Sequence, residues 1–244
     1  MRLTRIFVTD PLTPGAEVRL SASAASHVSK VLRLKEGAPL IVFDGTGGEH
    51  RSEITRVAGS NVHVALKEFM PGAPESALKL TLVQGVSRGE RMDWTLQKAT
   101  ELGVSAIVPV LTARSVVRLD ERQSLAKREH WQAVVVSACE QCGRTRVPGI
   151  APPVRLRDYL ATSKKEGLRL ALSPVAQGSL AGLASVPQKL ELLIGPEGGL
   201  DDNEHLIAEQ AGYLPVRLGP RVLRTETASV VALSVLQALW GDLQ

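Results

Sequence analysis

The sequence predicts an α/β protein in which a small β-rich module precedes a mostly parallel sheet with helices on both faces. From Lys79 onward, strand-like apolar runs alternate with longer helix-like runs, which is typical of βαβ units. Before Met70 the apolar runs are short and separated by turns, which favours a small barrel. The stretch from Met70 to Glu75 contains two prolines and one glycine and is typical of a linker. We therefore expect one domain over residues 1–72 and another over residues 73–244.

Within residues 1–72 the pattern predicts four strands and one helix. The helix runs from Ser21, its N-cap, to Leu34, because apolar residues recur on one of its faces. Two of the strands form a hairpin across residues 58–61. The strands are expected at residues 5–8, 40–45, 54–57 and 62–66. Five cations gather around the first strand and the helix, where they either bind phosphates or form an ordinary charged rim: Arg2, Arg5, Lys30, Arg33 and Lys35.

Beyond the linker, strands and helices are expected in alternation. Gly103 is placed to end the first helix, and Asp201 with Glu204 predicts a capping box at the start of a later one. The strands are expected at residues 80–83, 106–111, 168–172, 190–194 and 214–218, and the helices at 91–102, 121–141 and 202–211.

The last predicted helix, residues 227–240, is apolar around nearly its whole circumference. Such a helix must be buried on more than one side. The sheet covers one side, and either a second copy of the protein or more of the same chain covers the other. We expect a homodimer.

Two glycine-rich segments near the C-terminus predict a ligand site. Residues 192–200 and 218–228 each begin with an apolar run that ends at a Gly-Pro pair, as a buried strand entering a tight turn would. Glycines at 195, 198 and 199 free the backbone for positive φ and let a ligand approach closely. Elbows of this kind at the ends of neighbouring strands are where open α/β sheets hold ligands.

The amino-acid composition limits which kinds of molecule the protein is expected to bind. Aromatic residues make up 3% of the chain, so stacking on aromatic platforms is not the main mode of nucleic-acid binding. Residues 88–157 carry twelve basic and seven acidic residues, whereas residues 158–244 carry seven and ten, which favours one face that binds an anionic polymer. The chain lacks both an apolar run of membrane-spanning length and a signal-peptide core near its start, so we expect a cytoplasmic protein.

The two cysteines, Cys139 and Cys142, form a C-x-x-C pair late in a predicted helix. A redox pair usually precedes a helix, and a structural zinc site needs two further ligands at suitable spacing. The five histidines are scattered along the chain. We therefore expect no metal site.

Several motifs occur in an order that is specific to one family. Residues 194–199 read IGPEGG and residues 218–228 read LGPRVLRTETA. Residues 91–104 contain R-M-x-W followed by Q-K-A-T-E-L-G, and residues 140–144 read E-Q-C-G-R, with Cys142 where serine is usual. The first module contains R-x-F from Arg5 and H-x-x-x-V-L-R from His27, and Arg88 stands where a lysine is common. The chain resembles the RsmE-type RNA methyltransferases of the SPOUT class, which methylate N3 of a uridine in small-subunit (16S) ribosomal RNA.

The resemblance implies a PUA-like barrel followed by a SPOUT domain with a C-terminal trefoil knot, acting as a homodimer on the small ribosomal subunit. It also implies that S-adenosylmethionine binds in the knot. By this resemblance the cofactor-binding residues are Leu172, Ile194, Gly195, Pro196, Glu197, Gly198, Gly199, Leu218, Gly219, Leu223, Arg224 and Thr225.

Three charged residues of this region are expected to take part in methyl transfer. Uracil N3 must lose a proton before it attacks a methyl group, and a cation stabilises the anion that results. We expect Arg224 to be this cation and Glu197 or Glu226 to orient it or remove the proton. Because a guanidinium fork suits phosphate, the RNA contacts are assigned mainly to arginines: Arg5, Lys30, Arg33, Arg88 and Arg144.

Three alternatives remain open at this point. Arg224 would be purely structural if it paired with Glu226 or Glu197 to hold the knot. The methylated atom would differ if the enzyme acted on the ribose 2′-oxygen, as SPOUT relatives also do, and analysis of the modified nucleosides separates the two products. A non-catalytic RNA-binding assembly factor would bind no S-adenosylmethionine, so a calorimetric titration discriminates against that class.

Overall fold

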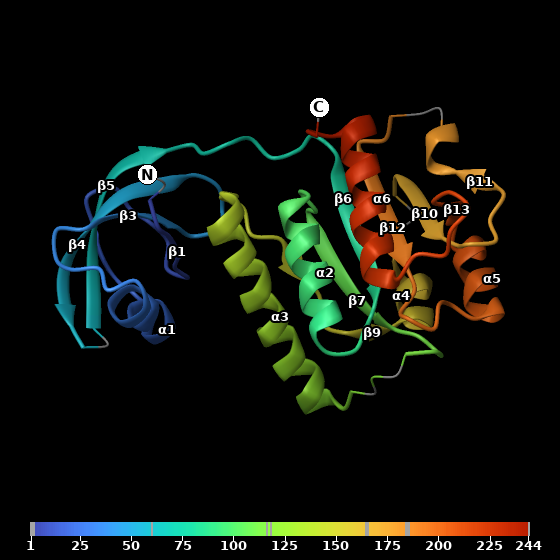
Figure 1. Cartoon of the computed structure of the whole chain (residues 1–244), viewed down its shortest axis with the longest axis horizontal. Helices are drawn as coiled ribbons and strands as arrows, with labels where there is room; N and C mark the ends of the chain where they lie inside the picture. The colour runs from blue at the N-terminus through green and yellow to red at the C-terminus, as the bar shows by residue number, and fades with distance from the viewer. Residues whose placement is uncertain are drawn as a thin grey trace. The chain divides into compact units, whose positions relative to one another are not determined.

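A computed structural model describes residues 3–59, 61–115, 117, 119–163, 166–183 and 186–243 (Figure 1). The chain divides into two compact units. The N-terminal unit contains residues 1–75 together with 136–147, and the C-terminal unit contains residues 76–135 together with 148–244.

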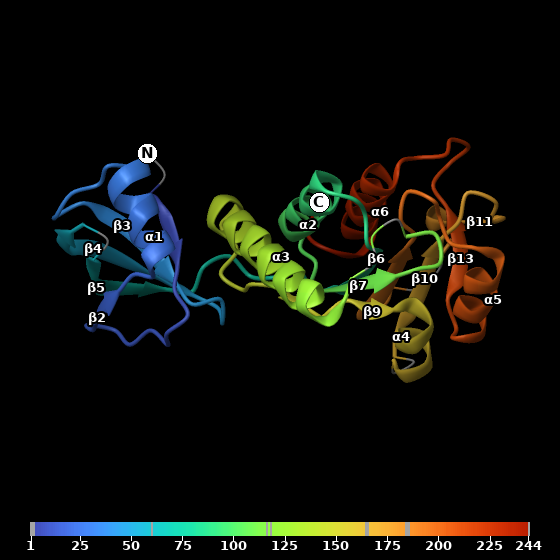
Figure 2. The same cartoon turned by 90° about the horizontal axis from the view of Figure 1, so that it is seen from below.

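The N-terminal unit is built on a five-stranded sheet with the order β1-β3-β4-β5-β2 (Figure 2). Strand β1 runs parallel to β3, and all other pairs are antiparallel. The predicted hairpin is confirmed as β4 and β5, which pair up to Ala58 and Asn61. The strands are β1 (Arg5–Phe7), β2 (Glu17–Arg19), β3 (Pro39–Phe43), β4 (Glu49–Ala58) and β5 (Asn61–Met70).

The predicted helix of this unit is confirmed at its start and is shorter than expected. Ser21 caps α1 (Ala22–Ser26) by accepting a hydrogen bond from the amide of Ala24 at 3.3 Å. The chain then widens into one π-helical turn, η1 (His27–Val31), and Arg33 takes a positive φ of 54°. A residue in the left-handed region ends a helix, which explains why the element stops before Leu34.

The C-terminal unit contains an all-parallel sheet with the order β11-β13-β10-β12-β6-β7-β8, and β9 also pairs with β7. This confirms the predicted parallel sheet. The strands are β6 (Lys79–Gly85), β7 (Ala106–Leu111), β8 (Gly149–Ile150), β9 (Val154–Arg155), β10 (Leu168–Leu172), β11 (Gly178–Ser179), β12 (Lys189–Ile194) and β13 (Leu214–Arg217).

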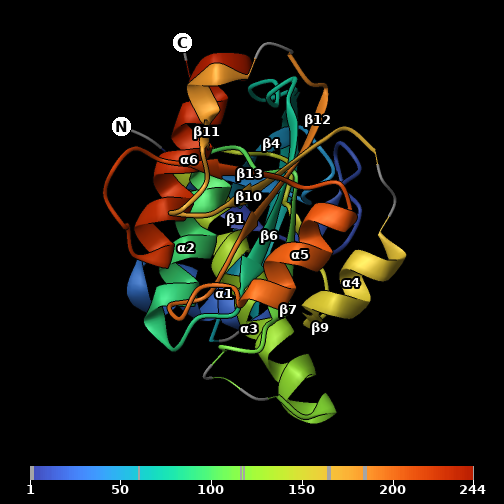
Figure 3. The same ribbon diagram turned by 90° about the vertical axis from the view of Figure 1, so that its right-hand side faces the viewer.

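Helices cover both faces of this sheet (Figure 3). Helices α2 (Glu90–Glu101) and α6 (Thr225–Trp240) lie on one face, and α4 (Leu156–Thr162) and α5 (Asp202–Gln210) lie on the other. The long helix α3 (Glu121–Cys142) belongs to this unit up to residue 135, and a 3₁₀ turn, η2 (Leu180–Gly182), follows β11. The predicted capping box is confirmed: Asp201 Oδ1 accepts from the amide of Glu204 at 2.7 Å, and Glu204 Oε2 accepts from the amide of Asp201 at 3.0 Å.

The central strands are buried on both faces, as expected for apolar runs in a parallel sheet. Val83, Ala171 and Leu193 pack toward α4 and α5 in one apolar cluster. Because β13, β10 and β12 are parallel neighbours, their carboxyl ends meet at one edge of the sheet. The loops that follow these three strands are therefore brought together.

The structure also bears on membrane association. In the described part of the chain, every helix is too short or too polar to cross a lipid bilayer.

Candidate functional site

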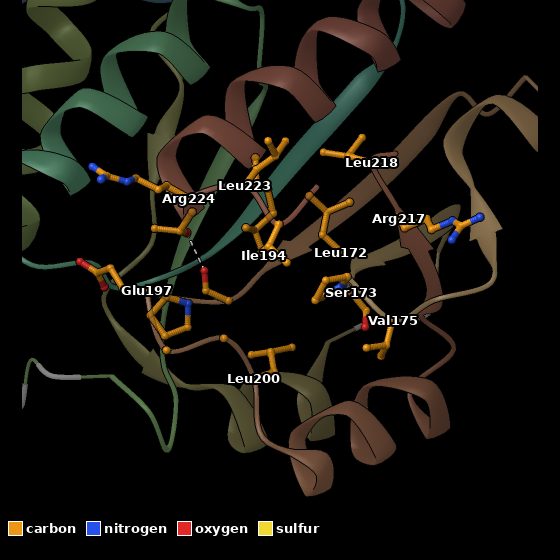
Figure 4. A pocket seen from close by; sticks show the side chains of 18 of the residues that line it. Leu172, Ser173, Val175, Ile194, Glu197, Leu200, Arg217, Leu218, Leu223 and Arg224 are labelled. Carbon is orange, nitrogen blue, oxygen red and sulfur yellow. Dashed lines mark hydrogen bonds between the residues drawn. The ribbon is translucent and has the colours of Figure 1, made fainter. Parts of the chain in front are cut away.

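A cavity of about 660 Å³ opens where the loops after β10, β12 and β13 converge (Figure 4). Its size falls in the range of roughly 300–1,000 Å³ that is typical of small-molecule sites. All twelve residues predicted to bind a cofactor line this cavity, so the fold brings them together from the ends of β10 and β12, the loops after β12 and β13, and the start of α6. Their contact with a cofactor remains a prediction.

The centre of the cavity is apolar and its edges are charged. Leu172, Ile194 and Leu223 gather at the centre in Figure 4. The side chain of Arg224 extends away from them toward the same edge as Glu197, and Arg217 lies on the opposite side. An apolar floor with a few placed charges suits a ligand that has both an aromatic ring and ionic groups.

The glycines of the loop after β12 serve different purposes. Of the three glycines at 195, 198 and 199, only Gly199 has a positive φ, at 70°. Gly195 is needed for close approach, because a Cβ there would lie 2.9 Å from the carbonyl carbon of Gly199. Gly198 likewise leaves room for Arg114, whose Cβ would lie 2.9 Å away from an added Cβ. Of the two purposes expected for these glycines, positive φ therefore applies to Gly199, whereas Gly195 and Gly198 allow other parts of the protein to approach closely.

Glu197 anchors this loop to the start of α2. Its Oε1 accepts a hydrogen bond from the amide of Arg88 at 3.0 Å and pairs with Arg91 Nη1 at 3.1 Å. Partial burial acts to raise the pKa of Glu197, but the bonds donated by the Arg88 and Glu197 amides and by Arg91 outweigh burial and hold the pKa below its usual value. Glu197 is therefore an ionised carboxylate whose Oε1 already accepts hydrogen bonds from Arg88 and Arg91.

Arg114 holds the loop from the other side. Its Nη1 donates to the carbonyls of Gly198 at 3.2 Å and Leu200 at 3.3 Å. The neighbouring amide of Ala113 donates to Glu204 Oε1 at 2.8 Å, which ties the same segment to the start of α5. Sequence reasoning missed Arg114, because a single arginine after a strand carries no motif and its partners lie 84 and 86 residues away.

A buried hydrogen-bond network fixes the first turn of α6. Thr225 Oγ1 donates to the carbonyl of Gly195 at 2.6 Å and accepts from Gln84 Nε2 at 3.0 Å. Ser229 Oγ donates to Gln84 Oε1 at 2.8 Å, and all three polar side chains are buried. The loop after β12 is thus held by α2, α6 and the segment after β7, so the cavity is formed before any ligand binds.

The two remaining candidates for catalysis lie at the start of α6. Arg224 is exposed, and none of the described residues forms an ion pair with its guanidinium. The alternative in which Arg224 pairs with Glu197 or Glu226 is therefore not seen. Glu226 Oε2 is buried and finds no hydrogen-bond partner in the described part of the chain.

The residues predicted to bind RNA fall into two groups. In the N-terminal unit, Arg5 pairs with Glu49 and donates to the carbonyl of Arg144 at 2.9 Å, while Arg144 pairs with Glu75. Both guanidinium groups are largely buried in these contacts. The other three cations have exposed side chains: Lys30, Arg33 and Arg88.

The cysteines show no sign of a reactive pair. Cys139 is fully buried, and burial raises the pKa of its thiol to about 12. Cys142 is half-buried and, like Cys139, forms no disulfide. Across the described residues, no group of three or more histidine, cysteine or acidic side chains is arranged to hold a metal ion.

The chain matches two family profiles and is similar to proteins of known name. Residues 74–237 match a family profile described as an RNA methyltransferase domain, and residues 12–67 match one described as an RNA methyltransferase PUA domain. The ribosomal RNA small subunit methyltransferase E of Bacillus subtilis is 33% identical, over 91% of this chain and 92% of its own length. The protein of the same name from Buchnera aphidicola (subspecies Schizaphis graminum) is 32% identical, over 99% of this chain and 98% of its own.

Two solved structures are also closely similar. A crystal structure of the Neisseria gonorrhoeae ribosomal RNA small subunit methyltransferase E bound to S-adenosylmethionine is 35% identical, with a TM-score of 0.92 and full coverage of both chains. A Legionella pneumophila protein in complex with the bound cofactor S-adenosylmethionine is 40% identical, with a TM-score of 0.96 and full coverage of both chains.

Proposed function

This chain belongs to the ribosomal RNA small subunit methyltransferase E family, and from that premise we propose that its methyl acceptor is N3 of a uridine in 16S ribosomal RNA. The coarser activity follows from family membership: the protein is an S-adenosylmethionine-dependent methyltransferase of small-subunit ribosomal RNA. The observation that carries the finer proposal is Arg224, which forms no ion pair with any described residue, at the edge of a preformed cavity that Glu226 also lines.

The cavity fits S-adenosylmethionine in chemistry as well as in size. Leu172, Ile194 and Leu223 offer aliphatic surface to an adenine ring, and the glycine-rich loops offer backbone groups without Cβ atoms. Exposed arginines at the rim suit the carboxylate at the charged end of the donor. The twelve lining residues named above would hold the donor. When bound, S-adenosylmethionine supplies an electrophilic methyl group on a sulfonium.

Arg224 supplies the charge that the acceptor needs. Loss of the N3 proton leaves negative charge that spreads onto the two flanking carbonyl oxygens of uracil, and a guanidinium next to one of them favours the anion. Glu197 is poorly suited to take that proton, because Arg88 and Arg91 occupy its oxygen and its pKa is lowered. We assign Glu197 to positioning of the cofactor loop instead.

The N-terminal barrel and the start of α2 supply cations for RNA. Residues 12–67 match a PUA domain, which supports an RNA-binding role for residues 1–72. Lys30, Arg33 and Arg88 are exposed and suited to bind phosphate, whereas Arg5 and Arg144 would first have to leave their ion pairs. We therefore propose the three exposed cations as the first contacts.

We further propose that the last part of the chain is threaded as a trefoil knot and that the protein is a homodimer. The contacts from the first turn of α6 to Gln84 and Gly195 support a crossing of the chain at this point. A knot would tighten when single molecules are stretched and leave the chain shorter than its full contour length.

Exposed apolar residues on α2 and α6 support the dimer. Action on ribosomal subunits would place the protein in the cytoplasm.

The methylated product tests the proposed function. Isolated small subunits and naked 16S RNA are incubated with the protein and labelled S-adenosylmethionine, and the RNA is digested to nucleosides for mass analysis. The expected product is 3-methyluridine. A ribose-methylated nucleoside would identify 2′-oxygen as the acceptor and overturn the N3 proposal, and absence of both cofactor binding and label would favour a non-catalytic assembly factor.

A further inference from the structure

Glu226 combines two properties that call for a ligand. It lines the cavity, and its Oε2 is buried without a hydrogen-bond partner among the residues that the structure describes. A buried carboxylate oxygen in this state has lost its water without gaining a replacement, which is costly. A bound group that presents an N–H donor would remove this cost once the side chain turns Oε2 into the cavity.

The other titratable groups of the cavity are less suited to meet a base next to Arg224. Glu197 is already satisfied by the amide of Arg88 and the guanidinium of Arg91. Asp202 and His205 lie on α5, which covers the opposite face of the sheet from α6 (Figure 3). Glu226 lies only two residues beyond Arg224 on the chain. The remaining charged residues that line the cavity are all cations: Arg91, Arg114, Arg217, Arg221 and Arg224 itself.

The pairing edge of uracil is complementary to an acid and a guanidinium that line the same cavity. It presents the N3–H donor between two carbonyl acceptors. We propose that Glu226 Oε2 accepts the N3 proton of the target uridine while Arg224 binds a flanking carbonyl, an assignment that rests on the proposed function. Cytosine has an unprotonated N3 that accepts hydrogen bonds, so the same carboxylate repels it. Glu226 thus acts both as the general base and as the group that selects uridine.

The proton and electrons balance in this step. The N3–H bond breaks and its proton passes to Glu226 Oε2, which becomes a neutral carboxylic acid. The electron pair left on N3 forms the new bond to the methyl carbon. The carbon–sulfur bond of the donor breaks and its electron pair stays on sulfur, which becomes a neutral thioether. Arg224 offsets the charge on the uracil oxygens until the new bond has formed.

The test compares Glu226→Gln with the wild-type protein across pH 6 to 9. Glutamine keeps the size of the side chain and removes the base. Single-turnover methyl transfer to isolated small subunits measures the chemical step, and calorimetry measures S-adenosylmethionine binding independently of activity. Glu209→Gln, at an exposed acid of α5, is the control for loss of one negative charge.

The expected result is a rate lower by about 10²–10⁴-fold for Glu226→Gln near neutral pH, with cofactor affinity unchanged. The difference in rate between Glu226→Gln and the wild type should shrink as pH rises, because hydroxide then removes the N3 proton without help from the protein. A near-native rate, a deficit independent of pH, or loss of cofactor binding would each overturn the assignment. These outcomes leave the proposed function intact as long as the wild-type protein forms 3-methyluridine.

Discussion

Replacement of Arg224 by alanine should slow methyl transfer by about 10²–10³-fold, because removal of one preorganised donor to a developing oxyanion typically costs that much. The side chain is exposed and unpaired among the described residues, so its loss should leave folding nearly unchanged and weaken cofactor binding by less than it slows methyl transfer. Single-turnover rates and a calorimetric titration measure the two effects separately.

Two matched variants make this expectation specific. Arg224→Lys keeps the charge and loses the planar fork, so it should recover part of the rate. Arg157→Ala removes an exposed arginine of α4 on the opposite face of the sheet and should behave as wild type. A native rate for Arg224→Ala would mean that the guanidinium does not stabilise the reacting base.

At the scale of residues, sequence reasoning found the groups that lie in motifs and missed those that act singly. Gly195 and Gly199 stand beside Gly-Pro or Gly-Gly steps that mark tight turns, and the cavity forms there. Gln84 and Arg114 have no such local signal, because the partners through which they hold the cavity lie 84 to 145 residues away and only the fold brings them close. The different roles of neighbouring glycines also depend on what packs against each one.

At the scale of elements, the loop after β12 depends on the segment after β7. Arg114→Ala removes both bonds to the carbonyls of Gly198 and Leu200, so the loop should become mobile before the cofactor binds. Because Arg114 is exposed, the effect should be moderate, a roughly tenfold weaker affinity for S-adenosylmethionine, or about 1.4 kcal/mol.

The measurement for Arg114→Ala separates positioning from general destabilisation. The Michaelis constant for S-adenosylmethionine should rise while kcat and the melting temperature change little, and Arg114→Lys should restore part of the affinity. Arg122→Ala, at an exposed arginine of α3, controls for charge. A fall in kcat with an unchanged Michaelis constant would instead place Arg114 in the chemical step.

Elements with strong local signals were predictable, and those shaped by distant contacts were not. The capping box of Asp201 and Glu204 fixed the start of α5, because both partners lie within one turn. Helix α4 spans seven residues, too few for an apolar period to stand out, and strands β8, β9 and β11 span two residues each. The helix after Ser21 ends early because Arg33 adopts a left-handed conformation, which an arginine in the sequence does not signal.

At the scale of the whole molecule, α6 links the cavity to the proposed dimer. Its first turn holds the loop after β12 through Thr225, and its exposed side carries Val231 at 37% and Leu239 at 46% exposure. Trp94 of the adjacent α2 is 42% exposed, so both of these neighbouring helices carry exposed apolar side chains. Apolar surface shared between neighbouring helices is typical of an interface between subunits.

Leu239→Asp should therefore convert a dimer into a monomer, because a carboxylate buried at an apolar interface has no partner. Sedimentation at micromolar concentration should give twice the chain mass of 26.1 kDa for the wild type and the single mass for the variant. Leu206→Asp changes a similarly exposed leucine on α5, across the sheet from α6, and should leave the dimer intact. A monomeric wild type would show that α6 is covered within one chain, and dissociation by both variants would show that the effect is not specific to α6. Since Thr225 and Arg224 begin this helix, loss of the dimer should also weaken cofactor binding.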